Sequence, residues 1–242
     1  MGYFCGLMKN FPTKEELQQG AVMLIDKPYR WTSFDALNKV RRLINTKIGH
    51  CGTLDPLATG LLICCTGKKT KEIENYQKQP KEYTGIIQLG ATTPTYDLES
   101  EPTDLKSFEH LTEEEIRNAT APFTGAILQT PPAHSAIKKD GKRAYELARK
   151  GIEMKLEPRP VTISEFEITK IENGEVHFRI GCSTGTYIRS LAHDFGAALG
   201  CGGYLKALRR TKIGSFSVDD APEVSEWVDK LKDEVADKEV NS

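Results

Sequence analysis

The sequence predicts an α+β fold with mainly antiparallel strand connections. Apolar and polar residues alternate from Val176 to Cys182, as expected for a strand with one buried face. The Asn-Gly pair within residues 172–175 predicts a tight hairpin turn just before that strand. Segments with helical spacing of apolar residues lie between the predicted strands, and no internal repeat is present. Together these features are typical of α+β proteins.

A strand at residues 21–26 and a helix from Thr32 or Ser33 come first along the chain. Either hydroxyl can cap the helix, whose apolar residues recur at helical spacing and predict a buried stripe. The stripe consists of Phe34, Leu37, Val40 and Ile44. A glycine-rich loop at 49–60 and a buried strand at 61–65 follow.

The later elements are predicted from local signals of the same kind. They are a short helix from Thr70, a strand at 83–89, a helix from the capping box at 112–115 to residue 119, a basic helix at 141–150, a strand at 161–168 with a register break, and a helix at 187–199. Gly151 and Gly200 can end the two longer helices.

The loop at residues 49–60 is the most informative part of the chain. Its glycines can adopt backbone angles closed to other residues, and Pro56 restricts both itself and Asp55. One carboxylate therefore sits on a constrained loop beside a buried strand, which is a typical position for catalysis. A structural Asx turn is the alternative interpretation of Asp55.

The charge distribution favours a basic surface for phosphates, although the formal net charge of the chain is −1. Of the 34 acidic and 33 basic residues, nine acidic and three basic ones lie in residues 219–242, so residues 1–218 carry a formal charge of +5. Basic residues gather at 27–50, 68–81, 138–150 and 206–212. A basic face for RNA fits this asymmetry, whereas ordinary solvated faces are the alternative for any single cluster.

Composition and targeting signals predict a cytoplasmic protein without a metal site. The 242 residues are 38% hydrophobic and 28% charged, and no apolar run reaches the length of a membrane span. The N-terminus has no signal-peptide pattern. The six cysteines form no Cys-x-x-Cys pair, which favours free thiols over disulfides or zinc.

Several further motifs share the order and spacing of one known family. The chain resembles the tRNA pseudouridine-55 synthases of the TruB family over residues 21–218. The matching blocks are Leu24–Pro28, Thr32-Ser33, Gly49–Gly60, Gly67–Lys71, Lys81–Tyr83, Gly90–Asp97, Gln129–Ala136, Gly185–Arg189 and Leu208–Thr211. Two places depart from the family pattern: Cys51 occupies a position often filled by other small residues, and Arg30-Trp31 stands where a glycine-led turn is usual.

The resemblance implies the pseudouridine synthase fold, a mixed, mainly antiparallel sheet with flanking helices and loops around a central RNA-binding cleft. It implies a catalytic domain at residues 1–218, within which the insertion at 129–151 clamps the T loop. Residues 219–242 are then an acidic tail, which is too short for the RNA-binding PUA domain that full-length bacterial relatives usually add. We expect this tail to matter little for RNA binding, or to weaken non-specific binding by repelling phosphate.

The resemblance also implies isomerisation of uridine to pseudouridine at position 55 in the T loop of tRNA. The reaction breaks a glycosidic bond, turns the uracil and rejoins it through carbon 5, so it needs no redox step and no cofactor. The target base must first be flipped out of the folded loop. A carboxylate can serve as the nucleophile, and by resemblance this residue is Asp55. tRNA is the implied partner, and we expect a monomer with no obligate protein partner and no membrane association.

Two further catalytic residues follow from the resemblance. Arg189 is expected to pair with Asp55, because a bidentate arginine keeps a buried carboxylate ionised. Tyr187 is expected to lie over the target base or sugar and to accept a proton. A surface arginine and a core tyrosine are the plainer interpretations.

Four substrate-binding residues are implied in the same way. Tyr83 stacks on the flipped uracil, Leu208 forms an apolar wall of the pocket, His50 fills the gap left by the base, and Lys71 meets phosphate or lies beside the Asp55 loop. Core packing of Tyr83 and a structural role for His50 are the alternatives.

Three other functions stay open at the level of sequence. The chain could be a tRNA-folding chaperone, with or without catalysis, or a pseudouridine synthase for another RNA such as ribosomal RNA. A nucleophilic pair of Cys51 and His50 is the third, although adjacent residues rarely face each other.

Overall fold

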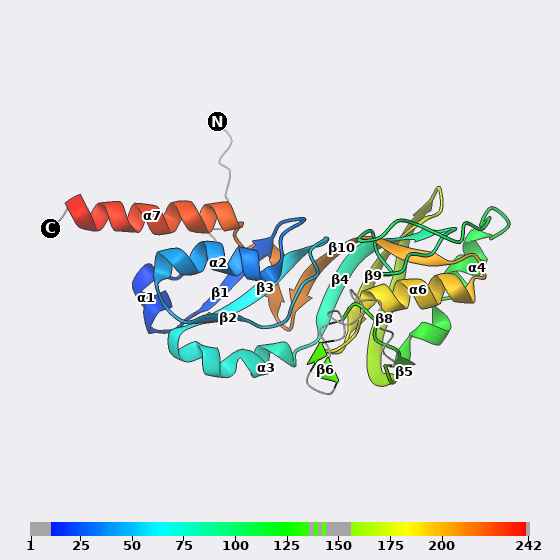
Figure 1. Ribbon diagram of the computed structural model, residues 1–242, viewed down its shortest axis with the longest axis horizontal. Helices are drawn as coiled ribbons and strands as arrows, with labels where there is room; N and C mark the ends of the chain where they lie inside the picture. Colours follow the sequence, from blue (N-terminus) through cyan, green and yellow to red (C-terminus); the bar gives the residue numbers. More distant parts are fainter. Residues whose placement is uncertain (1–10, 136–137, 140–141, 144–155, 241–242) are drawn as a thin grey trace. The chain divides into compact units, whose positions relative to one another are not determined.

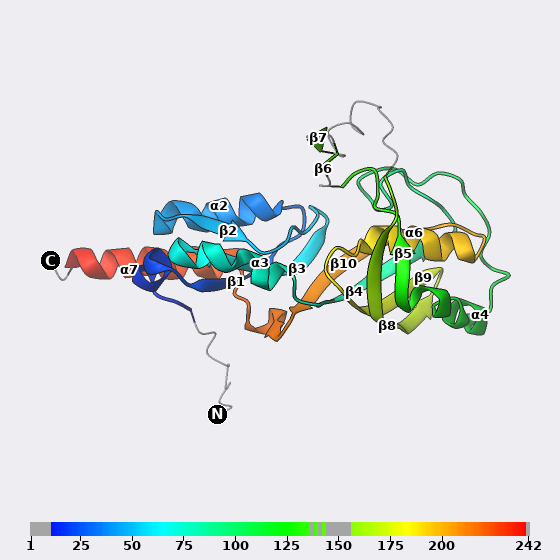
Figure 2. The same ribbon diagram turned by 90° about the horizontal axis from the view of Figure 1, so that it is seen from below.

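The computed structural model describes residues 11–135, 138–139, 142–143 and 156–240. The chain divides into two compact units, which are shown in Figures 1 and 2. Unit 1 combines the two ends of the chain, Met1–Gln79 and Arg209–Ser242, and unit 2 is the continuous segment Pro80–Leu208. Each unit has its own strands and helices, and the predicted α+β class is confirmed.

Unit 1 is built on a short sheet. Its strands are β1 (Val22–Lys27), β2 (Ile48–His50), β3 (Ala58–Thr66), the second part of β10 (Gly203–Ile213) and β11 (Phe216–Ser217). β1 pairs with β3 from Val22↔Cys65 to Lys27↔Gly60, and β2 pairs with the other end of β3. β10 then follows β3 in the strand order. Strands β2 and β3 therefore extend into both ends of the segment expected to be a loop.

The helices of unit 1 cover both faces of this sheet. They are α1 (Lys14–Gln19), α2 (Ser33–Ile44), the 3-10 helix η1 (Gly67–Glu72), α3 (Ile73–Gln77), the 3-10 helix η3 (Val218–Asp220) and α7 (Val224–Val240). Leu62 and Cys64 of β3 pack in one core cluster with α2 and α7, whereas Leu61 and Ile63 pack in another, toward α3. Figure 1 shows α2 and α7 side by side on one face of the sheet and α3 on the other. Because both faces of β3 are covered, its residues read as one continuous apolar run.

Helix α2 begins as predicted, but its apolar stripe is shorter than expected. Thr32 and Asp35 form a reciprocal capping box, and Leu37, Val40 and Ile44 are buried. Phe34, which the spacing assigns to the same stripe, is 61% exposed. It stands in the first turn, beyond the edge of the surface that the sheet and α7 bury.

The C-terminal segment is part of the core of unit 1 and does not extend from it as a separate tail. Val224, Trp227 and Leu231 of α7 are buried against α2 and β1. The indole Nε1 of Trp227 donates a hydrogen bond of 2.8 Å to the carbonyl oxygen of Leu24. Acidic residues occupy the other face of the helix, so the overall composition of the segment does not reveal its buried apolar face.

Unit 2 contains a strongly curved antiparallel sheet. Its order is the first part of β10, then β4 (Lys81–Leu89), β9 (Glu175–Cys182), β8 (Arg159–Glu172) and β5 (Gly125–Gln129). The predicted hairpin joins β8 to β9, with Asn173 and Gly174 both at positive φ. The predicted register break is also confirmed, since β8 shifts between Ile163 and Glu165 and again between Ile168 and Lys170.

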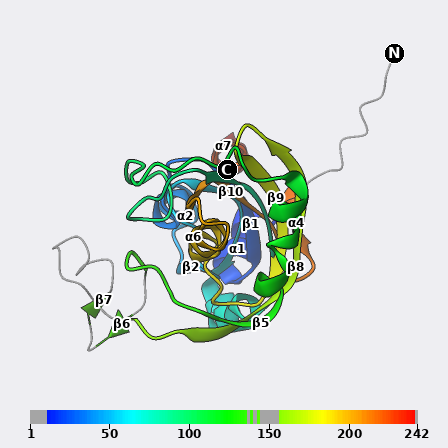
Figure 3. The ribbon, with the colours of Figure 1, turned by 90° about the vertical axis from the view of Figure 1, so that its right-hand side faces the viewer.

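Helix α6 (Ile188–Ala198) packs inside the curve of this sheet. Figure 3 shows the strands of unit 2 curving around it. The ring of Phe195 on α6 lies 5.4 Å from that of Phe166 on β8. The predicted capping box of Thr112 and Glu115 opens α4 (Glu113–Asn118), which precedes the 3-10 helix η2 (Ala121–Phe123). The sheet thus fixes the N-terminus of α6, where Tyr187 and Arg189 lie.

Part of the segment expected to be a basic helix at 141–150 has a different structure. Strands β6 (Lys138–Lys139) and β7 (Lys142–Arg143) pair with each other, so the prediction of a helix is wrong for residues 142 and 143. Residues 144–150 lie outside the described part of the chain. Among the residues that are described, no helix has both the length and the apolar character needed to cross a membrane.

Candidate active site

The loop that carries Asp55 is anchored from three other elements of unit 1. The backbone N–H of Leu54 donates to the hydroxyl of Ser33, at the start of α2, which in turn donates to the carbonyl oxygen of Leu54. The N–H of Arg30 donates to the carbonyl of Pro56 over 2.9 Å. These bonds hold the residues on either side of Asp55, so the half-buried carboxylate stands on a fixed backbone.

Arg210 on β10 provides the third anchor. Its guanidinium donates to the carbonyl oxygens of Gly52 and Leu61 over 3.1 Å and 2.8 Å. The side chain is only 2% exposed, and its hydrogen bonds to backbone carbonyls compensate for the burial of its charge. Gly60 permits this arrangement, because a Cβ there would come within 2.3 Å of the carbonyl oxygen of Arg210. The sequence resemblance includes Arg210 in a motif but gives no sign of this role.

A buried lysine lies below the same loop. Nζ of Lys27 is 2.5 Å from the carbonyl oxygen of Trp31 and 3.4 Å from that of Pro56. Burial lowers the pKa of Lys27 from 10.5 to about 8, and the negative charge of Asp55 opposes part of this shift. Lys27 therefore places a titratable cation near the candidate nucleophile.

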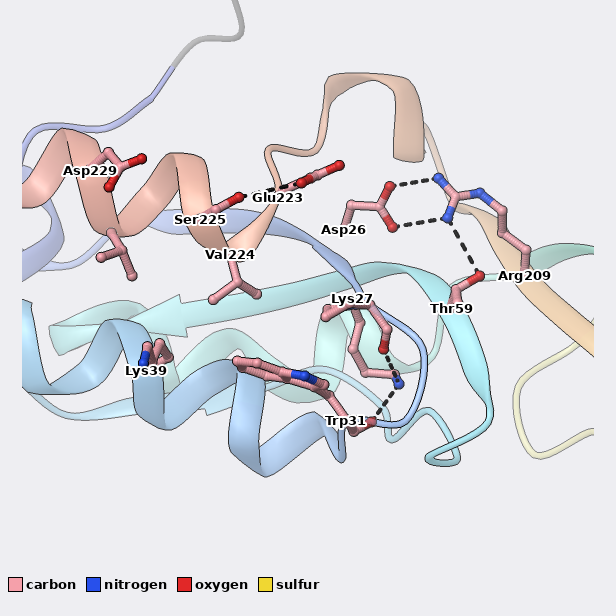
Figure 4. A pocket seen from close by; sticks show the side chains of 12 residues that line it. Asp26, Lys27, Trp31, Lys39, Thr59, Arg209, Glu223, Val224, Ser225 and Asp229 are labelled. Atoms are coloured by element: carbon pink, nitrogen blue, oxygen red, sulfur yellow. Dashed lines mark hydrogen bonds and ion pairs between the residues drawn. The ribbon is translucent and has the colours of Figure 1, made fainter. Parts of the chain in front are cut away.

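A pocket of about 610 Å³ opens beside Lys27 within unit 1. Figure 4 shows Trp31 and Lys39 from α2 and its preceding turn on one side, and Glu223, Ser225 and Asp229 around the start of α7 on the other. At one end, Arg209 forms a bidentate pair with Asp26, with N···O distances of 3.0 Å and 2.6 Å. None of the residues predicted for the site lines this pocket.

His50 and Lys71 also belong to unit 1. His50 ends β2, immediately before the loop, and its pKa is lowered by burial and by the positive charge of Arg210. It is therefore a neutral imidazole at pH 7, suited to packing against a base rather than to binding phosphate. Lys71 is exposed on η1, which suits a phosphate contact.

The environment of Cys51 argues against a cysteine nucleophile. Its thiol is fully buried and its sulfur lies 3.6 Å from that of Cys65. The hydrogen bond with Cys65 and burial raise the pKa of Cys51, so the thiol stays protonated. A nucleophilic cysteine needs the thiolate. The rival pair of Cys51 and His50 therefore loses support.

In unit 2, Arg189 is held by the carboxylate of Asp97, which is not among the site residues implied by the resemblance. Nε of Arg189 lies 3.6 Å from Oδ2 of Asp97, and both side chains are 6% exposed. The guanidinium also donates to the carbonyl oxygens of Thr95 and His134. Asp97 itself sits next to Leu205 through an isolated parallel bridge. The pairing of Arg189 with Asp55 stays a prediction.

Tyr187 and Tyr83 occupy different parts of unit 2. Tyr187 is the N-cap of α6, and its backbone exchanges hydrogen bonds of 2.8 Å and 3.0 Å with the side-chain amide of Gln129. Tyr83 lies on β4 opposite Ile180 and is 8% exposed. Leu208, on β10, is half-buried at the end of the unit. Gln129 is a further positioning residue that the sequence did not single out.

Comparison with known proteins gives matches along nearly the whole chain. The family model described as TruB family pseudouridylate synthase (N terminal domain) matches residues 40–188. A second, described as tRNA pseudouridylate synthase B C-terminal domain, matches residues 189–240. The second match includes α7, in keeping with its place in the core.

Similar curated proteins and solved structures agree with these matches. The chain is 52% identical to tRNA pseudouridine synthase B of Flavobacterium johnsoniae, over 91% of this chain and 100% of that protein. It is 50% identical to the protein of the same name from Chloroherpeton thalassium, over 88% and 90%. Among solved structures, a chain of a Cbf5-Nop10-Gar1 complex is similar with a TM-score of 0.68 and 29% identity, over 91% of this chain and 61% of that one.

Proposed function

Because this chain belongs to the TruB family of pseudouridylate synthases, we propose that it isomerises uridine to pseudouridine at position 55 in the T loop of tRNA. The observation that carries the proposal is the fixed position of Asp55, on a loop held by Ser33, Arg30 and Arg210. A backbone positioned in advance allows a carboxylate to act as nucleophile without reorganisation.

The proposed reaction balances without any added reactant. The target uridine is flipped out, and Asp55 assists cleavage of the bond between C1′ of the ribose and N1 of uracil. The free base turns, C5 bonds to C1′, and the proton that leaves C5 is balanced by one gained at N1. Tyr187 accepts the C5 proton in this scheme, and no cofactor takes part.

The other predicted residues keep their proposed roles. Arg189 keeps the nucleophile ionised, Tyr83 stacks on the uracil and Leu208 lines its pocket. His50 fills the gap left by the base, which its neutral charge state supports. Lys71, exposed on η1, binds phosphate.

The segment at 129–151 is proposed to hold the T loop. The proposed setting is the cytoplasm, and the proposed active form is a monomer without an obligate protein partner. Size-exclusion chromatography with light scattering, with and without tRNA, tests the oligomeric state.

The substitution Asp55→Asn tests the proposed function. Tritium release from tRNA labelled at C5 of uridine should be abolished, because the amide cannot act as nucleophile. Filter binding should change by only a few-fold, since the loop and the basic residues remain. Asp233→Asn, an exposed acid on α7, is the matched control and should keep full turnover. Substantial turnover by the Asp55 variant, or no release by the wild-type protein, would contradict the proposal.

A further inference from the structure

Three large side chains beside the Asp55 loop face solvent. Tyr29 is 48% exposed, Phe34 is 61% exposed, and Arg30 between them is exposed as well. The guanidinium carbon of Arg30 lies 5.5 Å from the centroid of the Tyr29 ring, in cation–π range. We call Tyr29, Arg30 and Phe34 the rim residues.

Arg30 adopts a backbone conformation that favours glycine. Its φ is 65°, in the left-handed region where a side chain is strained. In this conformation the N–H of Arg30 bonds to the carbonyl of Pro56. Glycine would make the same bond without strain, and the contact of the Arg30 side chain among the described residues is with the exposed ring of Tyr29. Strain kept at a residue beside a functional loop points to a function for that side chain.

The direction of the side chains supports the same conclusion. Trp31, the next residue, lines the pocket beside Lys27 (Figure 4). Phe34, in the first turn of α2, faces solvent although its spacing fits the buried stripe. In this part of unit 1, Leu37 is buried and Trp31 lines the pocket, whereas the rim residues remain exposed to solvent. No interaction of Arg30 with a carboxylate is found among the described residues.

We propose that the rim residues bind a nucleotide of the RNA substrate next to the target uridine. Arg30 contacts a phosphate, and Tyr29 and Phe34 contact the face of an unpaired base or its ribose. A guanidinium over one exposed aromatic ring, with a second exposed ring four residues further along the chain, suits RNA, which offers negative charge and flat bases in one unit. Exposed aromatic rings would also suit a protein partner, but their position favours RNA. The backbone of Arg30 is hydrogen-bonded to Pro56, the residue after Asp55, and the RNA substrate must bind next to Asp55. The inference rests on the proposed function and identifies a surface that determines affinity.

The substitution Arg30→Gly separates a binding role from a structural one. If Arg30 only shapes the turn, glycine should leave both stability and RNA binding as they are. On our proposal the melting temperature stays the same or rises, while the Kd for a T-arm hairpin increases about tenfold. The slope of log K against log salt becomes shallower by about 0.7 to 0.9, the loss of one phosphate contact. KM should rise and kcat should change little.

Further variants divide the proposed contact into its parts. Arg30→Lys keeps the charge and should retain the salt slope, but it loses stacking. Tyr29→Ala and Phe34→Ala should raise Kd about threefold to tenfold without changing the slope, a range set by roughly 1 kcal/mol of stacking per base. Asn173→Gly relieves a similar left-handed residue in unit 2, and Lys232→Ala removes an exposed cation from α7. Both controls should bind the hairpin like the wild type.

The outcomes distinguish this inference from the proposed function. If Arg30→Gly and the two aromatic variants bind and turn over the hairpin like the wild type, the rim residues are not an RNA contact. Destabilisation by Arg30→Gly, with a Kd that recovers on cooling, would also overturn the proposal. In either case the wild-type protein would still release tritium in the same assay, which shows that the proposed function stands.

Discussion

Nζ of Lys27 lies 3.4 Å from the carbonyl oxygen of Pro56, so a buried ammonium group touches the residue that follows Asp55. The same group donates to the carbonyls of Pro28 and Trp31. One cation thereby ties the turn after β1 to the loop of the candidate nucleophile. Its protonation state is therefore coupled to the geometry of the site.

We predict that turnover falls above pH 8 as Lys27 loses its proton, because its charge-assisted bonds to the loop weaken. Stability changes in the opposite direction. The pKa of Lys27 is lower in the folded chain, so the unfolded chain binds more protons between pH 8 and 10.5, and this group's contribution to stability rises with pH. Measuring kcat and melting temperature from pH 7 to 9.5 shows both trends. Lys27→Met should lose the alkaline limb of kcat, and Lys39→Met, an exposed lysine on α2, should retain it.

We predict that Asp97→Asn lowers both stability and turnover. It removes the Asp97 counter-charge from buried Arg189, and breaking a buried pair in this way costs roughly 3–5 kcal/mol. Urea denaturation measures the loss, and a double-mutant cycle with Arg189→Gln should be strongly non-additive. Additive effects would show that the two residues act independently.

We predict that α7 is required for the stability of unit 1. Trp227→Ala should destabilise the protein by roughly 3–5 kcal/mol, because it empties a fully packed site and frees the carbonyl of Leu24. Trp227→Phe, which keeps most of the volume, should cost less. Deletion of residues 229–242 removes buried Leu231 and should also lower the melting temperature. A truncated protein as stable as the wild type would restore the description of this segment as a tail.

The sequence predicted the elements whose signals are local. The hairpin at 172–175, the register break in β8 and the caps of α2 and α4 depend on neighbouring residues and are confirmed. β10 and α7 were missed because their apolar faces are defined by partners at the other end of the chain.

The site was predictable in part. Asp55 stands out because glycines and Pro56 constrain its loop. Lys27, Arg210 and Asp97 do not, because a buried charge depends on backbone carbonyls or counter-charges brought together by the fold. Phe34 shows the converse: its spacing fits a buried stripe, but the first turn of α2 extends past the packed surface.

The two-part composition of unit 1 determines the order in which the chain can mature during synthesis. Residues 80–208 form a continuous unit and can fold as soon as they leave the ribosome. The core of the first 79 residues is completed later, because Met23, Ile25 and Val40 share one core cluster with Trp227 and Leu231 of α7. A nascent chain that still lacks α7 therefore exposes apolar residues of its N-terminal segment, and such a surface is a binding site for chaperones.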